Sequence, residues 1–242
     1  MRNLFIAGLI NIFLLLPVTA MADSHGEGQE QKAVLVTGAS TGIGRKIAED
    51  LAAMGFHVYA GARKQKDLDE LNAIENIQAV RLDVTVQEDI DAAVETVSKG
   101  GKGLYGLVNN AGVFIGGPLI EVSVEDYEWI MDINVTGVYR VTQAFAPMII
   151  DSKGRITTIS SISGINSGAF FGHYTMSKHA VEAYTDSLAA EMEKFGVAVS
   201  AIEPGNYNSA IGATARKNMA SSLSVENSRF YKDVLHIFYI ID

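Results

Sequence analysis

Tyr174 and Lys178, four residues apart in the stretch YTMSK, are the side chains of this sequence best suited to acid–base chemistry. Residues at positions i and i+4 share one face of a helix, so Lys178 is expected beside Tyr174 if this stretch is helical. A phenol has an ordinary pKa of about 10, and a nearby positive charge lowers it by favouring the phenolate. The pair therefore predicts a proton donor and acceptor that works near neutral pH. The alternative is an ordinary surface pair on an amphipathic helix.

A glycine-rich stretch, TGASTGIG (37–44), is the second candidate for chemistry. Its glycines, Gly38, Gly42 and Gly44, permit a tight turn and let the backbone approach a phosphate closely. The stretch follows an apolar run and opens a helical pattern, and a helix N-terminus offers free N–H groups to an anion. This placement predicts a dinucleotide site. The alternative is a loop that is merely rich in glycine.

Three other polar stretches fall at or near the ends of expected strands: NNAG (109–112), DINVTG (132–137) and SSISG (160–164). Asn134, in the second of them, lies in the middle of an expected helix, where asparagine is mildly unfavourable. Open α/β sheets bind ligands at the carboxyl ends of their strands. These stretches are therefore expected to meet at one ligand site.

The elements that must position these residues alternate between short β-branched runs and longer helical patterns. Continuous apolar strands alternating with helices predict a parallel sheet covered on both faces, so we expect one doubly wound, Rossmann-like domain over residues 32–242. Ser123 with Asp126 resembles a capping box at a helix start. The expected strands are 33–38, 57–62, 78–84, 106–112, 154–161 and 197–205, and the expected helices are 44–55, 87–100, 123–149 and 173–196.

Composition excludes several classes of function. The 242-residue chain carries a net charge of -9, which argues against a nucleic-acid partner, because phosphate binding favours a basic surface. It has no cysteine, which excludes disulfides, zinc–thiolate sites and cysteine nucleophiles. Its five histidines show no metal-binding spacing, so no metal site is expected.

The N-terminus is a separate segment. Arg2 precedes the apolar run LFIAGLINIFLLL (4–16), and Ala20 and Ala22 stand in the A-x-A positions of a cleavage site. This pattern predicts a secretory signal peptide, residues 1–22, followed by a flexible lead-in, 23–31. The mature chain would then be exported to a periplasmic or lumenal compartment. The alternative is an uncleaved anchor, which alone would make a membrane a partner.

The quoted stretches, together with EPGN (203–206), resemble the short-chain dehydrogenase/reductase family in order and spacing over residues 32–210. The resemblance implies a catalytic tetrad of Asn134, Ser161, Tyr174 and Lys178. Tyr174 would exchange a proton with the substrate oxygen, and Ser161 would orient that oxygen. Lys178 would lower the pKa of Tyr174 and hold the nicotinamide ribose. Asn134 would hold a water in the proton relay.

The resemblance also implies a nicotinamide cofactor. Where relatives that bind NAD carry an Asp, this sequence has Ala62 followed by Arg63 and Lys64, which favours NADP over NAD because a guanidinium suits a 2′-phosphate. Arg45 would add charge, and Ser209 would contact the carboxamide. The implied cofactor-binding residues are Gly38, Ser40, Thr41, Gly42, Ile43, Gly44, Arg63, Asp83, Val84, Asn110, Ala111, Gly112, Tyr174, Lys178, Pro204 and Gly205.

The expected substrate wall is apolar, which suggests a small lipophilic alcohol or carbonyl compound of the kind handled by the steroid and retinoid branch of the family. His173, next to Tyr174, is expected to be a surface residue at a helix start. The residues expected to form the wall are Phe114, Phe170, Phe171, Tyr207 and Ile211.

The C-terminal part departs from the family pattern, because 38 residues follow Pro204 without a recognisable last strand and helix. We expect the domain to lack these elements and to be less stable for it, with 213–234 as a substrate-loop helix. The alternative function is a truncated, non-catalytic nucleotide-binding or scaffold protein. The resemblance also implies a homodimer or homotetramer, formed through the helices expected at 123–149 and 173–195.

Overall fold

The computed structural model describes residues 31–205 and 225–234 of the chain. The predicted signal peptide, most of the predicted lead-in, and Tyr207, Ser209 and Ile211 lie outside the described residues. None of the helices in the described ranges is both long and apolar enough to cross a membrane.

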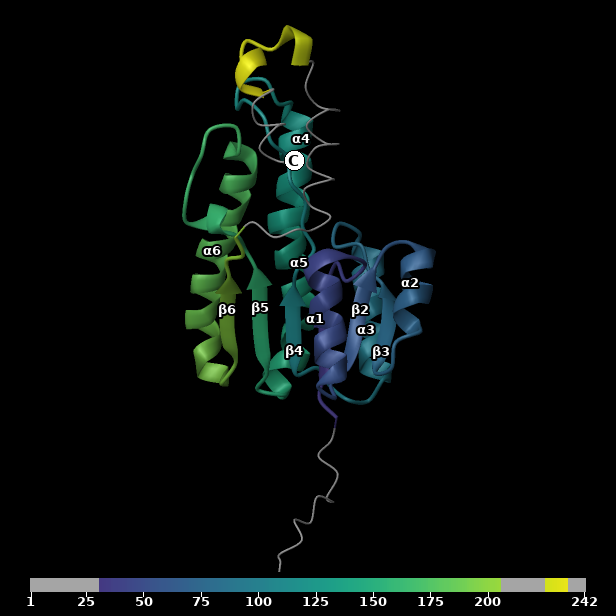
Figure 1. Cartoon of the computed structure of the whole chain (residues 1–242). Helices are drawn as coiled ribbons and strands as arrows, with labels where there is room; N and C mark the ends of the chain where they lie inside the picture. Colours follow the sequence, from purple (N-terminus) through teal and green to yellow (C-terminus); the bar gives the residue numbers. More distant parts are fainter. Residues whose placement is uncertain (1–30, 206–224, 235–242) are drawn as a thin grey trace, which may run out of the picture. The chain divides into compact units, whose positions relative to one another are not determined.

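The described strands form one six-stranded parallel sheet in the order β3-β2-β1-β4-β5-β6 (Figure 1). Leu35 of β1 stands level with Tyr59 of β2 on one side and Leu107 of β4 on the other. This confirms the predicted Rossmann-like sheet. The strands are β1 (Ala33–Val36), β2 (His57–Ala62), β3 (Ile77–Arg81), β4 (Gly106–Asn109), β5 (Arg155–Ile159) and β6 (Ala198–Ile202).

Helices connect successive strands. The α-helices are α1 (Gly42–Ala53), α2 (Gln65–Asn72), α3 (Gln87–Lys99), α4 (Val124–Met131), α5 (Gly137–Asp151) and α6 (Gly172–Met192). Four shorter segments complete them: the π-helix η1 (Asp132–Thr136) and the 3-10 helices η2 (Ile162–Gly164), η3 (Glu193–Phe195) and η4 (Val225–Asn227).

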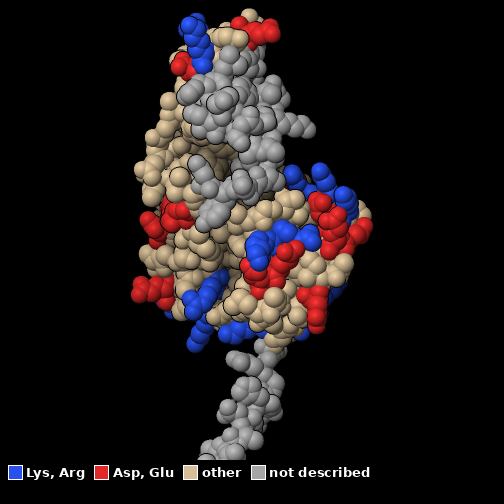
Figure 2. All heavy atoms as spheres, viewed as in Figure 1, with Lys and Arg blue, Asp and Glu red and all other residues tan. Residues whose placement is uncertain are grey.

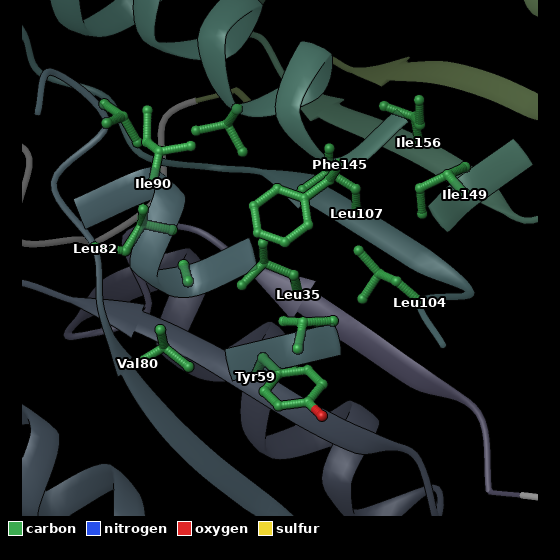
Figure 3. Close-up of a cluster of buried hydrophobic side chains, with 14 of the residues drawn as sticks. Leu35, Tyr59, Val80, Leu82, Ile90, Leu104, Leu107, Phe145, Ile149 and Ile156 are labelled. Carbon is green, nitrogen blue, oxygen red and sulfur yellow. The ribbon is translucent and has the colours of Figure 1, made fainter. Parts of the chain in front are cut away.

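Two hydrophobic cores lie on opposite faces of the sheet. Helices α1 and α2 pack small and branched side chains, such as Ala48 and Leu71, against one face. Helices α3, α5 and α6 cover the other face, where Phe145 of α5 lies over Leu35 and Leu107 (Figure 3). All four residues of β1 are buried, as expected for a central strand covered on both sides.

The predicted helix 123–149 exists, but it contains a π-helical turn. Ser123 caps α4, since its Oγ accepts a hydrogen bond from the Asp126 N–H at 3.1 Å. The π turn follows and carries Asn134, and π turns often occur at functional sites. The turn ends at Gly137, whose added Cβ would lie 2.6 Å from Val84 Cγ2. The sequence signals a helix here but not its change of pitch.

Helix α2 was not predicted, because only Leu68 and Leu71 give it an apolar face. Strand β6 is at one edge of the described sheet, and its residues alternate between exposed and half-buried positions. On the face shown in Figure 2, acidic and basic side chains are interspersed, and the visible described residues form no extended positive stripe.

Candidate active site

The glycine loop joins the end of β1 to the start of α1 and has no room for side chains at two of its three glycines. Gly38 has a φ of +63°, and an added Cβ would lie 2.8 Å from Ala111 Cα. At Gly44 a Cβ would lie 2.2 Å from Asn110 Nδ2. Gly42 has a φ of +59°, which glycine tolerates best. Glycine therefore lets this loop pack closely on Ala111 and Asn110, while Thr41 is exposed and Ser40 and Ile43 are half-buried.

The NNAG stretch clamps the glycine loop in place. Asn110 Nδ2 donates to the carbonyl oxygens of Thr37 at 2.9 Å and Gly38 at 3.1 Å. In return, Thr37 Oγ1 accepts from the backbone N–H groups of Asn110 and Ala111, at 2.9 and 3.0 Å. Asn110 and Ala111 were predicted to bind the cofactor, and here they hold in place the glycine loop that is also predicted to bind it.

The N-terminus of α1 faces the ligand side of this loop. Thr41 is the N-cap residue, but no side chain among the described residues caps the helix through it. The unpaired N–H groups of a first helical turn and the helix dipole both favour an anion. A helix start that follows a glycine-rich loop fits the diphosphate of a dinucleotide.

At the ends of β2 and β3, Arg63 lies exposed with its Nη1 3.6 Å from Asp83 Oδ2. Thr85 donates two hydrogen bonds to Asp83 Oδ1, from its N–H at 3.0 Å and its hydroxyl at 2.7 Å. Burial pushes the pKa of Asp83 upward, but Thr85 and Arg63 outweigh it and hold the pKa below its usual value. Asp83 is therefore a carboxylate near neutral pH.

Two other residues predicted near the cofactor are already engaged by the protein. The Arg45 guanidinium pairs with Glu49 at 2.6 Å and lies 3.9 Å from Glu70, so two carboxylates compete for its charge. Val84 is buried against Gly137.

Asn134 fastens the loop after β4 to helix α6. Its Oδ1 accepts from the Val113 N–H at 2.8 Å, and its Nδ2 donates to the Val113 carbonyl at 2.9 Å and to Ser177 Oγ at 3.0 Å. Ser177 in turn donates to the Tyr174 carbonyl at 2.7 Å. Both polar atoms of the Asn134 side chain are engaged by these contacts, so it positions the backbone on both sides of the site.

The predicted tetrad converges at one place. Ser161 and Tyr174 are hydrogen-bonded through their side chains, and Lys178 Nζ lies 5.6 Å from the centroid of the Tyr174 ring. Gly112 lies next to both Asn134 and Lys178, because a Cβ added to it would be 3.4 Å from Asn134 Oδ1 and 3.8 Å from Lys178 Nζ. Four separate stretches of sequence therefore meet around Tyr174, as their positions near strand ends predicted.

Backbone contacts fix both partners of Tyr174. Ser161 Oγ accepts from the Ser163 N–H at 3.1 Å, which fixes the hydroxyl oxygen beside Tyr174. Lys178 is buried and Nζ donates to the Ile159 carbonyl at 2.9 Å. The Ile162 N–H donates to the Pro204 carbonyl at 3.1 Å, which ties the serine turn to the end of β6. A Cβ added to Gly205 would meet no atom of the described residues within 4 Å.

The expectation that Lys178 lowers the pKa of Tyr174 is wrong, because the pKa is raised and Lys178 is not among the causes of the shift. Burial raises the pKa of Tyr174, and the Ser161 hydrogen bond offsets only part of that rise. Burial also lowers the pKa of Lys178 to about 8, against the opposing effect of Glu182. Both shifts have one physical cause, since removing a group from water disfavours its charged form.

Aromatic rings form an apolar wall beside Tyr174. The Phe114 ring lies 5.1 Å from the Tyr174 ring and 5.6 Å from the Phe171 ring, between centroids. Phe170, with a φ of +68°, packs on Phe230 at 5.7 Å. Residues 225–234 thus reach the loop that precedes α6.

A second contact holds residues 225–234 in place. The Ser228 hydroxyl donates to Glu121 Oε2 at 2.6 Å, and the Arg229 N–H donates to Glu121 Oε1 at 3.0 Å.

The prediction that His173 is a surface residue is wrong, because the side chain is buried at 4% exposure. Its ring meets the Tyr127 ring edge-on at 6.2 Å, in the contact between α4 and α6. Burial lowers the pKa of His173, and the Asp126 carboxylate offsets part of this shift. The residue's position at the first turn of a helix gave no signal that α4 would cover it.

Three residues that build the site were not predicted: Thr37, Val113 and Ser177. Thr37 opens the glycine stretch and Ser177 precedes the lysine of YTMSK, so both stood inside recognised motifs. Their roles depend on hydrogen bonds to residues more than 20 positions away, which one sequence does not display.

Comparison with known proteins agrees with this geometry. A family model described as short chain dehydrogenase matches residues 32–220. The chain belongs to the short-chain dehydrogenase/reductase family. Its tetrad stretches and its glycine loop fall within the matched residues.

Several curated relatives are similar over three quarters of this chain. D-beta-hydroxybutyrate dehydrogenase, mitochondrial, of Rattus norvegicus is 37% identical over 195 residues. The match covers 76% of the present chain and 57% of the rat protein. The 17-beta-hydroxysteroid dehydrogenase type 6 of Bos taurus is 39% identical, covering 75% and 59%. The chain therefore spans less than two thirds of the length of these relatives.

A solved structure shows the same fold. The short chain dehydrogenase/reductase of Burkholderia phymatum, in complex with NAD, superposes with a TM-score of 0.77 at 26% identity. The match covers 88% of this chain and 79% of that structure.

Proposed function

We propose that this protein is an oxidoreductase that transfers a hydride between NADP(H) and a carbonyl compound or secondary alcohol. The observation that carries the proposal is the convergence of Ser161, Tyr174 and Lys178 in a buried site beside an apolar wall. A phenol held by a serine hydroxyl and an amine can exchange a proton with a substrate oxygen. The cofactor, when bound, supplies or accepts the hydride.

Each residue has a distinct role in this proposal. Tyr174 gives its proton to the oxygen of a carbonyl substrate, or takes one from an alcohol. Ser161 would turn its hydroxyl hydrogen from the Tyr174 oxygen to the substrate oxygen, while the Ser163 N–H holds the Ser161 hydroxyl oxygen in place. Lys178 keeps two ammonium hydrogens beyond the one bonded to Ile159, and these are available to the cofactor ribose.

The residues of the glycine loop would hold the cofactor diphosphate. Gly38, Gly42 and Gly44 leave the backbone bare, and the start of α1 offers uncapped N–H groups. The preference for NADP(H) rests on Arg63, whose side chain is exposed next to Asp83. Arg45 contributes less, because Glu49 holds its guanidinium.

We infer a lipophilic substrate from Phe114, Phe171 and the Phe170–Phe230 contact, since these rings would surround the carbon atoms next to the reacting oxygen. Relatives named as hydroxysteroid and retinol dehydrogenases support this substrate class. A second copy of the chain is the proposed partner. Trp129 of α4 and Tyr139 of α5, both partly exposed aromatic side chains, support an interface there.

The activity is tested with Tyr174→Phe, which keeps the ring and removes the hydroxyl. NADPH binding, followed by its fluorescence, should remain within about threefold of wild type, roughly 0.65 kcal/mol. Turnover of lipophilic ketones should fall by at least about a hundredfold, the lower range for general acid catalysis. Turnover that survives within about tenfold would refute the acid–base role. NADPH binding without turnover in the wild type would favour a non-catalytic nucleotide-binding protein.

The cofactor preference is tested with Arg63→Ala. NADPH affinity should fall by about 1.5–3 kcal/mol, the worth of a charge-assisted hydrogen bond, and NADH affinity should hardly change. Arg155→Ala, which removes an arginine at the amino end of β5, is the matched control. Equal losses for both cofactors would refute a role in recognising the 2′-phosphate.

A further inference from the structure

A carboxylate lies one helical turn beyond Lys178, on the side away from Tyr174. Glu182 follows Lys178 by four residues on α6 and therefore shares its helix face. The Glu182 residue is half-buried, but its Oε1 is fully buried. Within the described ranges, Glu182 Oε1 and Ser160 Oγ are both buried without a hydrogen-bond partner. Buried polar atoms without partners are uncommon and suggest a specific role.

Gly164 provides the space for this carboxylate. A Cβ added to Gly164 would lie 2.8 Å from Glu182 Oε1 and 2.8 Å from Ser160 Oγ. The two oxygens are therefore no more than twice that distance apart. A side chain on residue 164 would therefore displace the Glu182 carboxylate from its place beside Gly164 and Ser160.

The Glu182 carboxylate raises the pKa of the buried Lys178 amine and so favours the charged ammonium form. Burial of Lys178 lowers its pKa to about 8, and Glu182 opposes this shift. Among the described residues, Glu182 is the charged group that acts on the pKa of Lys178. The other charged or titratable groups on α6, and on or next to the described elements packed against it, are Glu125, Asp126, Tyr127, Glu128, Asp132, His173, Tyr174, His179, Tyr184, Asp186, Glu191, Glu193, Lys194 and Glu203.

We propose that Glu182 is a positioning residue of the active site, which sustains the ammonium charge of Lys178 from a buried position for which Gly164 leaves room. The proposal rests on the proposed oxidoreductase function, in which Lys178 binds the ribose as an ammonium group. Glu182 itself touches neither substrate nor cofactor in this role.

The test measures Lys178 directly, without cofactor or substrate. Protein labelled with ¹³C at the lysine ε-carbons is titrated by NMR, and the Lys178 signal is assigned from its loss in Lys178→Arg. In Glu182→Gln, the midpoint of Lys178 should fall by about one pH unit, the lower range for an opposite charge a few ångströms away. In Glu182→Asp, which restores the charge, the midpoint should return most of the way to wild type.

Asp186→Asn is the matched control, because this exposed carboxylate lies eight residues from Lys178 on the same helix, about 12 Å along its axis. At ordinary ionic strength a charge at that distance is largely screened, so the midpoint should stay within about 0.2 pH units of wild type. An unchanged midpoint in folded Glu182→Gln would overturn the proposal.

Gly164→Ala provides a second variant if Glu182→Gln does not fold. It displaces the carboxylate without removing it, so the midpoint should move in the same direction by a smaller amount, and no movement would overturn the proposal. In active enzyme, the alkaline limb of kcat should move down by the same amount in Glu182→Gln. Failure of the oxidoreductase function would appear in Tyr174→Phe, whereas failure of this proposal would appear in the NMR titration alone.

Discussion

Replacing Asn134 by Asp should destabilise the protein severely, although the two side chains have nearly the same shape. The buried Asn134 amide nitrogen donates to the Val113 carbonyl at 2.9 Å and to Ser177 Oγ at 3.0 Å. A carboxylate oxygen in its place would face the Val113 carbonyl with no hydrogen to share. The contact to the Val113 N–H would survive, because the substitution keeps that acceptor.

The size of the loss follows from counting these groups. Two hydrogen bonds worth about 1–1.5 kcal/mol each are lost, and an unsatisfied buried carbonyl adds about 1–3 kcal/mol. The total, about 4 kcal/mol, is a large part of a domain's margin of about 5–15 kcal/mol. With a urea dependence of about 2–3 kcal/mol per M, the unfolding midpoint should fall by about 1–2 M.

The assay is urea unfolding followed by the fluorescence of Trp129, the one tryptophan of the chain, which lies on α4 just before the π turn. The difference in urea midpoint between Asn134→Asp and wild type should shrink as pH falls, because protonation gives the introduced carboxyl group a hydrogen to donate. Asn72→Asp is the control, since Asn72 only accepts a hydrogen bond, from the Ala79 N–H at 2.7 Å, and an Asp can do the same. Equal midpoints for Asn134→Asp and wild type would refute the account of Asn134 as the link between loop and helix.

Three further predictions concern the loops around the site. Gly44→Ala should abolish NADPH binding in a fluorescence titration and lower Tm, because the new methyl group would collide with the Asn110 amide. Thr85→Val should cost about 1.5 kcal/mol of stability at pH 7, since it removes a hydrogen bond to the Asp83 carboxylate. Glu121→Gln should speed amide hydrogen exchange in residues 225–234, because it weakens the contact that holds them.

The controls and the pH dependence sharpen these predictions. Gly205→Ala should leave Tm unchanged, because no atom of the described residues lies within 4 Å of the added methyl group; equal effects of both glycine variants would contradict the steric account. The pKa of Asp83 is lower in the folded protein, so its stabilisation is complete above the unfolded value of about 3.9 and is lost as pH falls through the folded value. If Thr85→Val still lowered stability at pH values below the folded pKa of Asp83, the lost stability would not come from the Asp83 carboxylate. Unaltered amide hydrogen exchange in Glu121→Gln would show that the Glu121 contacts do not hold residues 225–234 in place.

Much of the fold was predictable because its signals are local. Strand β1 has four buried apolar residues, and α1 ends just before Gly55, whose φ of +90° is natural for glycine. The meeting of the polar stretches at one site was likewise predictable, since the carboxyl ends of parallel strands meet at one edge of a sheet, whereas the tetrad was proposed from the resemblance to the family.

The rest depends on contacts between distant residues. The π turn at Asn134 gives no periodic signal, and the burial of His173 is decided by α4, which lies more than 40 residues earlier in the chain. The raised pKa of Tyr174 was missed for a related reason. A charge four residues away is visible in the sequence, whereas the loss of water around the phenol depends on Phe114 and the whole fold.

The amides of Asn110 and Asn134 have a consequence for the thermodynamics of ligand binding. Both side chains bond to backbone atoms of neighbouring loops, so those loops are ordered before any ligand arrives. Ordering a residue's backbone costs about 1–2 kcal/mol of conformational entropy, and here that cost belongs to folding. A nucleotide entering the site then loses little affinity to loop ordering. Mutations at these two positions should therefore weaken binding mainly through entropy, a change that calorimetry can distinguish from the enthalpic loss of a direct contact.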